Sequence, residues 1–464
     1  MFIRKITITN FRPFSSTFTI DNLNVPNTID KGSGLNVFVG ENGCGKTTLM
    51  DALVLPILEY KAESVSLDDL FDINHSIDIK IFSDQVFTYN GTMPHTSYKG
   101  KGFEFEAKLR SRSSATYLSS VVVSDQRFIR ADGETKPEDG KPDLRLKVDN
   151  PWKGPRFTDN DILYLDRNRT FQIRSGTYNP TRFDRIMEDY NYQFLKNFAP
   201  IKDLDGRITR KILEKFENPH LKKAIEKFKE ICGEDIRLSI INNHQPFKNA
   251  FFAYAKPDNH QIPLSNIGSG YEMIFAILYS YYLSQQSGKQ LILLIDEPEL
   301  HLHPSLQETF AQLLLEFSQN AQIFITTHSP LLIKQIMTAV QPLIKVLLKQ
   351  SGRIKEATIA ERKLSYLSAN EINYIAFQLP TEEYHNELYE ELFRQYATTP
   401  HILGFDIDYF QNVKGESASY PWKGTPNRVS LHTYIRNQIH HRSDNGTASI
   451  SDIKNSIEKM RSFL

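Results

Sequence analysis

The chain has little cysteine and no excess of charge of either sign. Only Cys44 and Cys232 occur in 464 residues, which is too few for a disulfide framework and gives no metal-ligand spacing. Lys plus Arg and Asp plus Glu both total 55, so no global positive field points to nucleic acid, although a local basic stripe could lie within a neutral total. The cysteine usage fits a reducing compartment, and we expect a cytoplasmic protein.

Long apolar runs are also missing. No segment approaches the ~20 apolar residues that a membrane-spanning helix needs, and residues Met1 to Phe11 alternate apolar and polar side chains instead of forming a secretory apolar block. We therefore expect no membrane partner. The apolar content of 40% is still sufficient for a buried core, and the length allows two to four domains.

A glycine-rich segment follows the first predicted buried strand, Leu35 to Val39, and precedes an apolar helical pattern. Glycines let consecutive backbone N–H groups approach a phosphate, and a helix N-terminus adds partial positive charge. Lys46 would reach the β- and γ-phosphates, and the Thr47 hydroxyl would bind Mg²⁺. A glycine turn without function is the alternative, and the flanking strand and helix argue against it. The predicted nucleotide-binding residues are Gly40, Asn42, Gly43, Cys44, Gly45, Lys46, Thr47 and Thr48.

Two carboxylates follow a second predicted buried strand. The apolar run from Leu291 to Ile295 ends at Asp296-Glu297-Pro298, which puts both acids at the carboxyl end of a parallel strand, where α/β sheets bind ligands. Asp296 suits Mg²⁺, and Glu297 suits polarisation of the attacking water. Adjacent acids after a strand are often only a solvated turn, but the glycine-rich loop in the same chain favours the catalytic interpretation.

A histidine follows a third predicted strand. Ile323 to Thr327 ends in His328-Ser329-Pro330, and one predicted helix, Ser305 to Phe317, separates this strand from the acids. This spacing predicts a neutral imidazole at the same edge of the sheet. We expect His328 to sense the γ-phosphate in catalysis; the alternative is an ordinary loop residue.

A short polar motif, Ser269-Gly270-Tyr271-Glu272, opens the apolar helical pattern Met273 to Leu283. This motif resembles the signature motif of ABC ATPases. Glu299 to His303 resembles their D-loop, and His328 resembles their switch histidine. Ile8 to Arg12 resembles the opening strand of the RecF, SMC and OLD branch of that family. The resemblance implies an α/β ABC-type P-loop ATPase head that uses ATP and Mg²⁺.

The resemblance also implies a head-to-tail dimer. In this family the P-loop of one protomer faces the signature helix of another, with ATP between them. Ser269, Gly270 and Glu272 would then bind the nucleotide in trans. Because a single chain carries one copy of each motif, we expect a complete site to require self-association.

The separation of Lys46 from Asp296 is larger than one P-loop domain needs, so we expect an insertion. Stretches such as Phe103 to Leu109 and Tyr117 to Val123 alternate as antiparallel strands do, and Thr181 to Cys232 has helical spacing. We predict that residues 1–75 form the N-terminal part of the ATPase lobe with the P-loop, and that residues 76–245 form an inserted β and helical subdomain. Residues 246–345 would form the C-terminal part of the lobe, with the signature, the acids and the switch histidine. Residues 346–464 would form a mostly helical partner-binding domain.

The C-terminal residues are mostly helical in pattern. Asp406 and Asp408 resemble the Asp-x-Asp pair of the Toprim module of OLD nucleases, but few residues follow them, so we expect a helix or turn surface instead. A compact ATPase lobe with a helical C-terminal domain is similar to the PtuA group of Septu antiphage systems. That resemblance implies a multimeric ATP-binding scaffold that holds an HNH nuclease (PtuB-like) through its C-terminal region, in a complex that acts on nucleic acid.

Two other functions remain open. Arg436 and His441 resemble the Arg-x4-His motif of HEPN ribonucleases, in which a neutral His serves as acid or base while Arg stabilises phosphate charge. An ATP-controlled toxin with its own ribonuclease site is therefore one alternative, although a polar helix end would explain the same residues. A RecF-like DNA repair ATPase is the other alternative.

Overall fold

The structure is a computed structural model of the whole chain. Its described residues divide into two compact units: residues 1–38, 45–344 and 350–354 make up the first, and residues 39–44, 345–349 and 355–464 make up the second. Each unit is considered by itself. The residues that the structure describes are 2–54, 67–90, 97–109, 117–124, 127–130, 133–134, 144–147, 156–157, 160–165, 167, 219–233, 236–240, 250–255, 261–263, 268–288, 290–339, 341–357, 362–422, 424–441 and 446–464.

A six-stranded sheet carries the predicted motifs. Its strand order is β11-β15-β16-β3-β17-β18, and β11 pairs with β15, and β15 with β16, in parallel. All residues of β3 and β16 are buried, which is expected for strands covered on both faces. The bounds are β3 Leu35–Val39, β11 Asn160–Leu165, β15 Gln290–Asp296, β16 Ala321–Thr327, β17 Leu343–Gln350 and β18 Arg353–Glu356.

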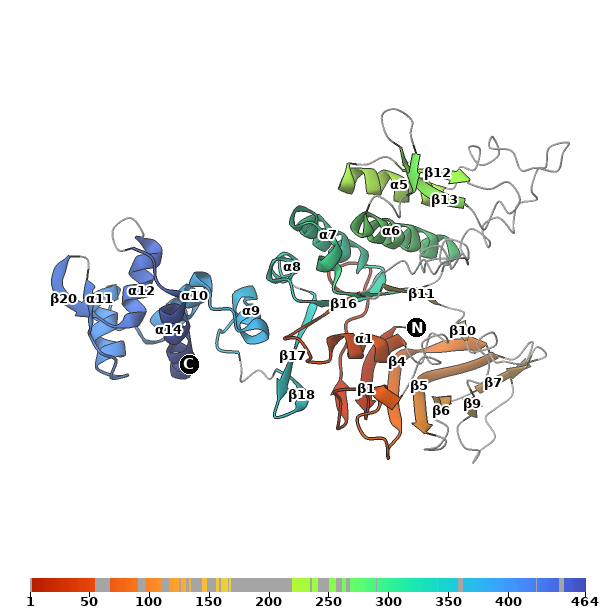
Figure 1. Cartoon of the computed structure of the whole chain (residues 1–464), viewed down its shortest axis with the longest axis horizontal. Helices are drawn as coiled ribbons and strands as arrows, with labels where there is room; N and C mark the ends of the chain where they lie inside the picture. The colour runs from red at the N-terminus through yellow and green to blue at the C-terminus, as the bar shows by residue number, and fades with distance from the viewer. Residues whose placement is uncertain are drawn as a thin grey trace. The chain divides into compact units, whose positions relative to one another are not determined.

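Helices cover these strands. Helix α1 and helix α6 both pack on β15, and in Figure 1 they lie on opposite sides of β16 and β11, the neighbours of β15 in the sheet. Helices α7 and α8 follow β15 and β16, so the three strands predicted from the sequence and the helices between them are confirmed. The bounds are α1 Lys46–Val54, α6 Ser269–Ser287, α7 Pro304–Phe317 and α8 Pro330–Ile336, with short 3-10 turns η1 Leu67–Asp69 and η3 Pro298–His301.

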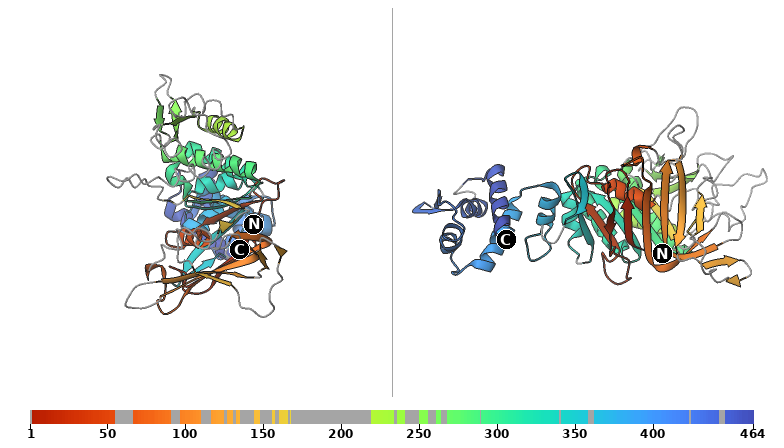
Figure 2. Two further views of the ribbon diagram at one scale, coloured as in Figure 1. Left: turned by 90° about the vertical axis from the view of Figure 1, so that its right-hand side faces the viewer. Right: turned by 90° about the horizontal axis from the view of Figure 1, so that it is seen from below.

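A second, antiparallel sheet has the order β2-β1-β4-β5-β6-β9, with β7, β8 and β10 paired at its side. The pairing of β5 with β6 confirms the antiparallel strands predicted in the insertion. Because β4 pairs with β1, these strands extend a sheet begun by the N-terminal residues; they are the orange strands in Figure 2. The bounds are β1 Ile3–Thr9, β2 Phe18–Ile20, β4 Ile77–Asn90, β5 Ser97–Leu109, β6 Tyr117–Ser124, β7 Arg127–Arg130, β8 Gly133–Glu134, β9 Leu144–Lys147 and β10 Arg156–Phe157.

A small lobe joins helix α5, Pro219–Cys232, to the antiparallel strands β12 Ile236–Ile240, β13 Ala250–Ala255 and β14 Gln261–Pro263. Phe228 of α5 packs edge-on against Tyr271 and Phe275 of α6, so this lobe rests on the signature helix. Helix α5 confirms the end of the predicted helical stretch; residues 181–218 of that stretch lie outside the described residues.

The C-terminal residues of the second unit form helices around an aromatic core. Tyr384, Tyr389, Phe405 and Phe410 are buried in it, and hydroxyl side chains cap the N-termini of the four longer helices, as is usual for serine and threonine. The helical prediction is confirmed, and a short hairpin was not foreseen. The elements are α9 Ala369–Phe377, α10 Glu382–Tyr396, α11 Ile402–Phe405, the π-helical η5 Asp406–Gln411, β19 Tyr420–Trp422, β20 Thr425–Val429, α12 Leu431–His440 and α14 Ile450–Phe463.

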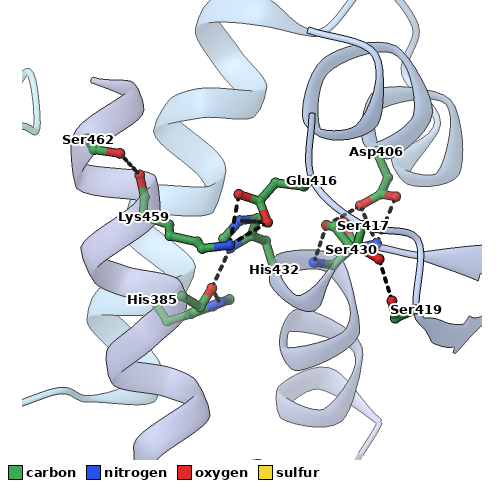
Figure 3. Close-up of polar contacts among 11 residues, drawn as sticks. His385, Asp406, Glu416, Ser417, Ser419, Ser430, His432, Lys459 and Ser462 are labelled. Carbon is green, nitrogen blue, oxygen red and sulfur yellow. Dashed lines mark hydrogen bonds and ion pairs between the residues drawn. The ribbon is translucent and has the colours of Figure 1, made fainter. Parts of the chain in front are cut away.

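The expectation that Asp406 belongs to the surface is wrong. Its side chain is fully buried and accepts hydrogen bonds from Ser430 Oγ at 2.6 Å and Ser430 N at 3.1 Å (Figure 3). The helical turn at η5 directs this carboxylate toward the start of α12, where a negative charge meets the positive end of the helix. Asp408 is exposed, as expected. No described helix of either unit is long and apolar enough to cross a membrane.

Candidate functional site

The ends of β15 and β16 are tied together by a threonine. In their register Asp296 stands opposite Thr326, and Thr326 Oγ1 donates a hydrogen bond to Asp296 Oδ1. The same hydroxyl oxygen accepts a hydrogen bond from Glu297 N at 3.1 Å. Thr326 therefore fixes both acids at once, and nothing in the sequence pattern distinguished it from the other buried residues of its strand.

Asp296 lies within reach of the helix that follows the glycine-rich loop. Its side chain is fully buried and is hydrogen-bonded to Thr47. Burial raises the pKa of Asp296 above its ordinary value, because the charged form loses solvation. A hydroxyl and a carboxylate together are oxygen ligands of the kind that Mg²⁺ prefers. The described residues therefore fit the divalent cation that a P-loop fold implies.

The glycine-rich loop joins β3 to α1. A side-chain carbon at Gly40 would stand 2.2 Å from the carbonyl oxygen of Leu347 and 2.7 Å from Cys44 Sγ, so only glycine fits there. Next in the chain, Lys46 and Thr48 are buried in the first turn of α1. Asn42 and Gly43 are exposed. A loop of this shape presents backbone N–H groups to an anion, as the predicted phosphate site requires.

Glu297 and His328 face each other. Glu297 Oε1 lies 3.3 Å from His328 Nε2, and the Glu297 side chain is mostly buried. Burial and the nearby positive charge of Lys46 lower the pKa of His328, so its imidazole is neutral near pH 7. Glu297 itself adopts a left-handed backbone conformation with φ 47°, which turns the chain away from β15 immediately after Asp296.

The signature residues begin helix α6. Glu272 is buried, and Glu272 N donates to Gly268 O at 3.2 Å. A side-chain carbon at Gly270 would stand 2.2 Å from the carbonyl oxygen of His301, so the start of α6 fits closely against the turn η3 of the same chain. Ser269 is the first residue of the helix. Their action on a nucleotide held by a second copy stays a prediction.

Four residues that the sequence analysis did not assign to the site form contacts that hold helix α1. Arg12 Nη1 donates to Asp51 Oδ2 at 2.6 Å, and Arg12 Nε donates to Asp69 Oδ1 at 2.7 Å. Tyr164 OH donates to the other oxygen of Asp51, Oδ1, at 2.9 Å. These contacts join the turn after β1 and the strand β11 to the helix that bears Lys46. The one sequence signal for these contacts was that Arg12 ends the segment, Ile8 to Arg12, that resembles the opening strand of the RecF, SMC and OLD branch.

A polar cluster in the second unit contains side chains of the kinds found in catalytic sites (Figure 3). Ser456 Oγ lies 2.9 Å from His385 Nε2 and 2.6 Å from His432 Nδ1, and Glu416 Oε2 lies 3.9 Å from His432 Nε2. Such a set could suggest nucleophilic catalysis. However, the serine and both histidines are fully buried, so no substrate reaches them, and the cluster is part of the packed core.

The HEPN-like residues lie at one end of α12. The Arg436 guanidinium sits over the ring of Tyr389, 5.7 Å from its centroid, which packs α12 on α10. His441 is exposed at the C-terminus of the helix. Among the described residues, no group of three or more His, Cys, Asp or Glu side chains could hold a metal ion, so the described part of the chain offers no metal-nuclease centre.

The parallel sheet, the loop between β3 and α1, and the acids and histidine at the ends of β15 and β16 define a P-loop ATPase fold of the ABC type, and this fold implies the binding of a nucleotide with a divalent metal ion. The chain belongs to the family described as "AAA domain, putative AbiEii toxin, Type IV TA system", which it matches over residues 35–334.

Several curated relatives are distant. The chain is 22% identical over 315 residues to protein ea59 of Escherichia phage lambda, covering 66% of this chain and 47% of that protein. It is 22% identical over 317 residues to the OLD nuclease of Thermus scotoductus, covering 64% and 55%. It is 22% identical over 368 residues to the Septu protein PtuA of Bacillus mycoides, covering 78% and 42%. The chain thus spans about half the length of these relatives.

Solved structures similar to the chain include heads of SMC proteins. An SMC head bound to the C-terminal winged-helix domain of ScpA matches 77% of this chain and 97% of its own, with 15% identity and a TM-score of 0.44. An SMC head with an extended coiled coil, bound to the C-terminal domain of ScpA derived from Pyrococcus furiosus, matches 77% and 96%, with 17% identity and a TM-score of 0.42.

Proposed function

We propose that this chain binds MgATP and hydrolyses it with Glu297 and His328, and that it serves as the ATP-controlled subunit of an antiphage defence complex. The observation that carries the ATPase part is the meeting of Thr47 with Asp296 and of Glu297 with His328 at the end of adjacent strands. In this proposal the predicted site residues have the roles that the sequence analysis assigned to them.

The chemistry follows from the positions of these side chains. Lys46 binds the β- and γ-phosphates. Thr47 and Asp296 would hold Mg²⁺, which would supply positive charge to neutralise the phosphates. Glu297 accepts a hydrogen bond from the attacking water and orients it toward the γ-phosphate. The neutral imidazole of His328 donates a hydrogen bond to the γ-phosphate oxygens. Ser269, Gly270 and Glu272 complete the site from a second copy of the chain.

The defence role rests on relatives. Two are named Septu protein PtuA and one OLD nuclease, and the described residues hold no metal-nuclease cluster. We therefore place nucleic-acid cleavage in a separate HNH nuclease held by residues 346–464, with ATP controlling multimerisation. The complex would act in the cytoplasm on nucleic acid. The alternatives, a HEPN-like toxin and a RecF-like repair ATPase, differ in where cleavage occurs and in whether DNA stimulates hydrolysis.

The test compares the purified chain alone with the chain reconstituted with an HNH nuclease encoded beside its gene. We expect ATP hydrolysis by the chain alone, no cleavage of plasmid DNA or RNA by the chain alone, and cleavage by the pair that changes with ATP. Cleavage by the chain alone that disappears in His441→Ala would instead establish the HEPN-like site. Hydrolysis that rises several-fold with DNA, in the absence of any nuclease partner, would favour the repair ATPase.

A further inference from the structure

The turn that follows Glu297 holds the main chain of the switch histidine. Glu299 Oε1 accepts a hydrogen bond from His328 N, and its carboxylate is also hydrogen-bonded to the Thr327 side chain. The second oxygen, Oε2, is buried and finds no partner among the described residues. Because Glu299 forms its hydrogen bonds with Thr327 and His328, at the end of β16, it is suited to position His328.

The neighbouring residues show that this bond is part of a fixed arrangement. Ser329 Oγ donates to Gln307 Oε1 at 2.8 Å, and Ser329 N donates to Thr327 Oγ1 at 2.9 Å. The main chain on either side of His328 is thus held, and only the imidazole is left to face Glu297 at 3.3 Å. Removing the bond to His328 N would free the one peptide group whose position sets that distance.

The same turn touches two other parts of the first unit. His301, at its end, places Nε2 3.0 Å from Arg167 O, beyond β11, and its carbonyl oxygen is the atom against which Gly270 fits. The turn η3 is therefore connected to the signature helix at one end and, through Glu299, to His328 in its middle. The same turn therefore contacts both the start of α6 and the main chain of His328.

We propose that Glu299 is a positioning residue for hydrolysis, which holds His328 at its working distance from Glu297 and links it to the turn packed against the signature helix. This inference rests on the proposed ATPase function. The bond from His328 N needs only an acceptor oxygen at the position of Glu299 Oε1. Glutamine offers a carbonyl oxygen there and should therefore replace Glu299, and alanine should not.

The first test is kinetic. Glu299→Ala should lower kcat about 10- to 100-fold, the effect of losing a buried hydrogen bond to a positioned group, while KM stays within about threefold. Glu299→Gln should restore most of kcat. Glu308→Ala, at an exposed position of α7, is the matched control and should behave as wild type. Unchanged kcat in Glu299→Ala, or an equal loss in Glu299→Gln, would overturn the proposal.

The second test does not need hydrolysis. With ¹³C-labelled histidine, the His328 Cε1 resonance, assigned by its loss in His328→Gln, should move in Glu299→Ala and return in Glu299→Gln, while the other histidine resonances stay in place. A His328 resonance unmoved in Glu299→Ala contradicts the proposal. Movement of all histidine resonances indicates general unfolding and contradicts it as well. If the wild-type protein shows no ATPase activity, the proposed function is wrong. The histidine resonances would still show whether Glu299 positions His328.

Discussion

Glu297 and His328 form a pair at the ends of neighbouring strands, with Glu297 Oε1 and His328 Nε2 3.3 Å apart. Burial and the positive charge of Lys46 lower the pKa of His328. In the proposed mechanism, Glu297 activates the attacking water and the neutral imidazole of His328 recognises the γ-phosphate, so neighbouring side chains take the two tasks.

Replacement of Glu297 by glutamine should slow hydrolysis without weakening ATP binding. The amide keeps the size of the side chain but cannot accept a proton, so we expect kcat to fall by about 10²- to 10⁴-fold while Kd for ATP changes less than about threefold. Sedimentation velocity should show ATP-dependent self-association that persists longer than in wild type. Normal turnover in Glu297→Gln would remove this residue as the base.

Replacement of Lys46 by alanine should weaken ATP binding directly. The phosphates lose a buried cation, whose hydrogen bond to a charged group is worth about 1.5–3 kcal/mol, so Kd should rise on the order of 10- to 100-fold. Titration calorimetry measures this effect, with Lys31→Ala, at an exposed position, as control. If both variants bind ATP as wild type does, the glycine-rich loop is not the phosphate site.

The signature helix should not tolerate a side chain at Gly270. A methyl group there would stand 2.2 Å from the carbonyl oxygen of His301, so Gly270→Ala must move either α6 or η3, at a cost of about 1–3 kcal/mol. We expect a lower thermal midpoint and reduced ATPase activity. Gln285→Ala, at an exposed position of the same helix, should change neither. An unchanged midpoint in Gly270→Ala would show that the contact is not tight.

The buried histidines of the second unit predict a loss of stability in acid. Burial lowers the pKa of His385 and of His432 to about 3, from an ordinary value of 6.5. Between these values the unfolded chain binds protons that the folded chain does not, so the free energy of unfolding falls as pH drops below 6.5. Each histidine should contribute a decrease of about 1 kcal/mol between pH 6.5 and 5.5, because the unfolded histidine is only half protonated at pH 6.5.

The measurement follows Trp422 of β19 during urea unfolding. Trp152 is the only other tryptophan, so a Trp152→Phe background makes the fluorescence specific to the hairpin. His432→Gln should flatten the dependence of unfolding free energy on pH, and His401→Gln, at an exposed position, should leave it unchanged. Equal pH dependence in all three proteins would contradict the assignment.

The sequence predicted the strands of the site better than its contacts. The predicted strands, Leu35 to Val39, Leu291 to Ile295 and Ile323 to Thr327, are mainly apolar runs that end in polar motifs. Such runs indicate buried parallel strands without any knowledge of the partner strand. Thr326 and Glu299 lie beside these motifs, but their roles depend on which strands become neighbours. Local patterns do not carry that information, because pairing joins residues far apart in the chain.

Two features of the second unit were not predicted from the sequence, for other physical reasons. Asp406 was expected in a helix or turn surface because too few residues follow it for a Toprim module. A charged residue is rarely buried unless paired, and here the partner, Ser430, is supplied by the start of a later helix. The hairpin β19–β20 is short and mostly exposed, so it lacks the alternating apolar pattern that would have predicted strands.

The strand order of the head has a consequence for synthesis on the ribosome. Strand β3 is synthesised early, but its neighbour β16 comes from residues beyond 320. The loop that follows β3 therefore lacks a neighbouring strand to support it until most of the chain has emerged from the ribosome. Nucleotide added during translation should therefore stabilise only chains that extend beyond β16. Until then the apolar residues of β3 depend on chaperones or on temporary contacts for protection from aggregation.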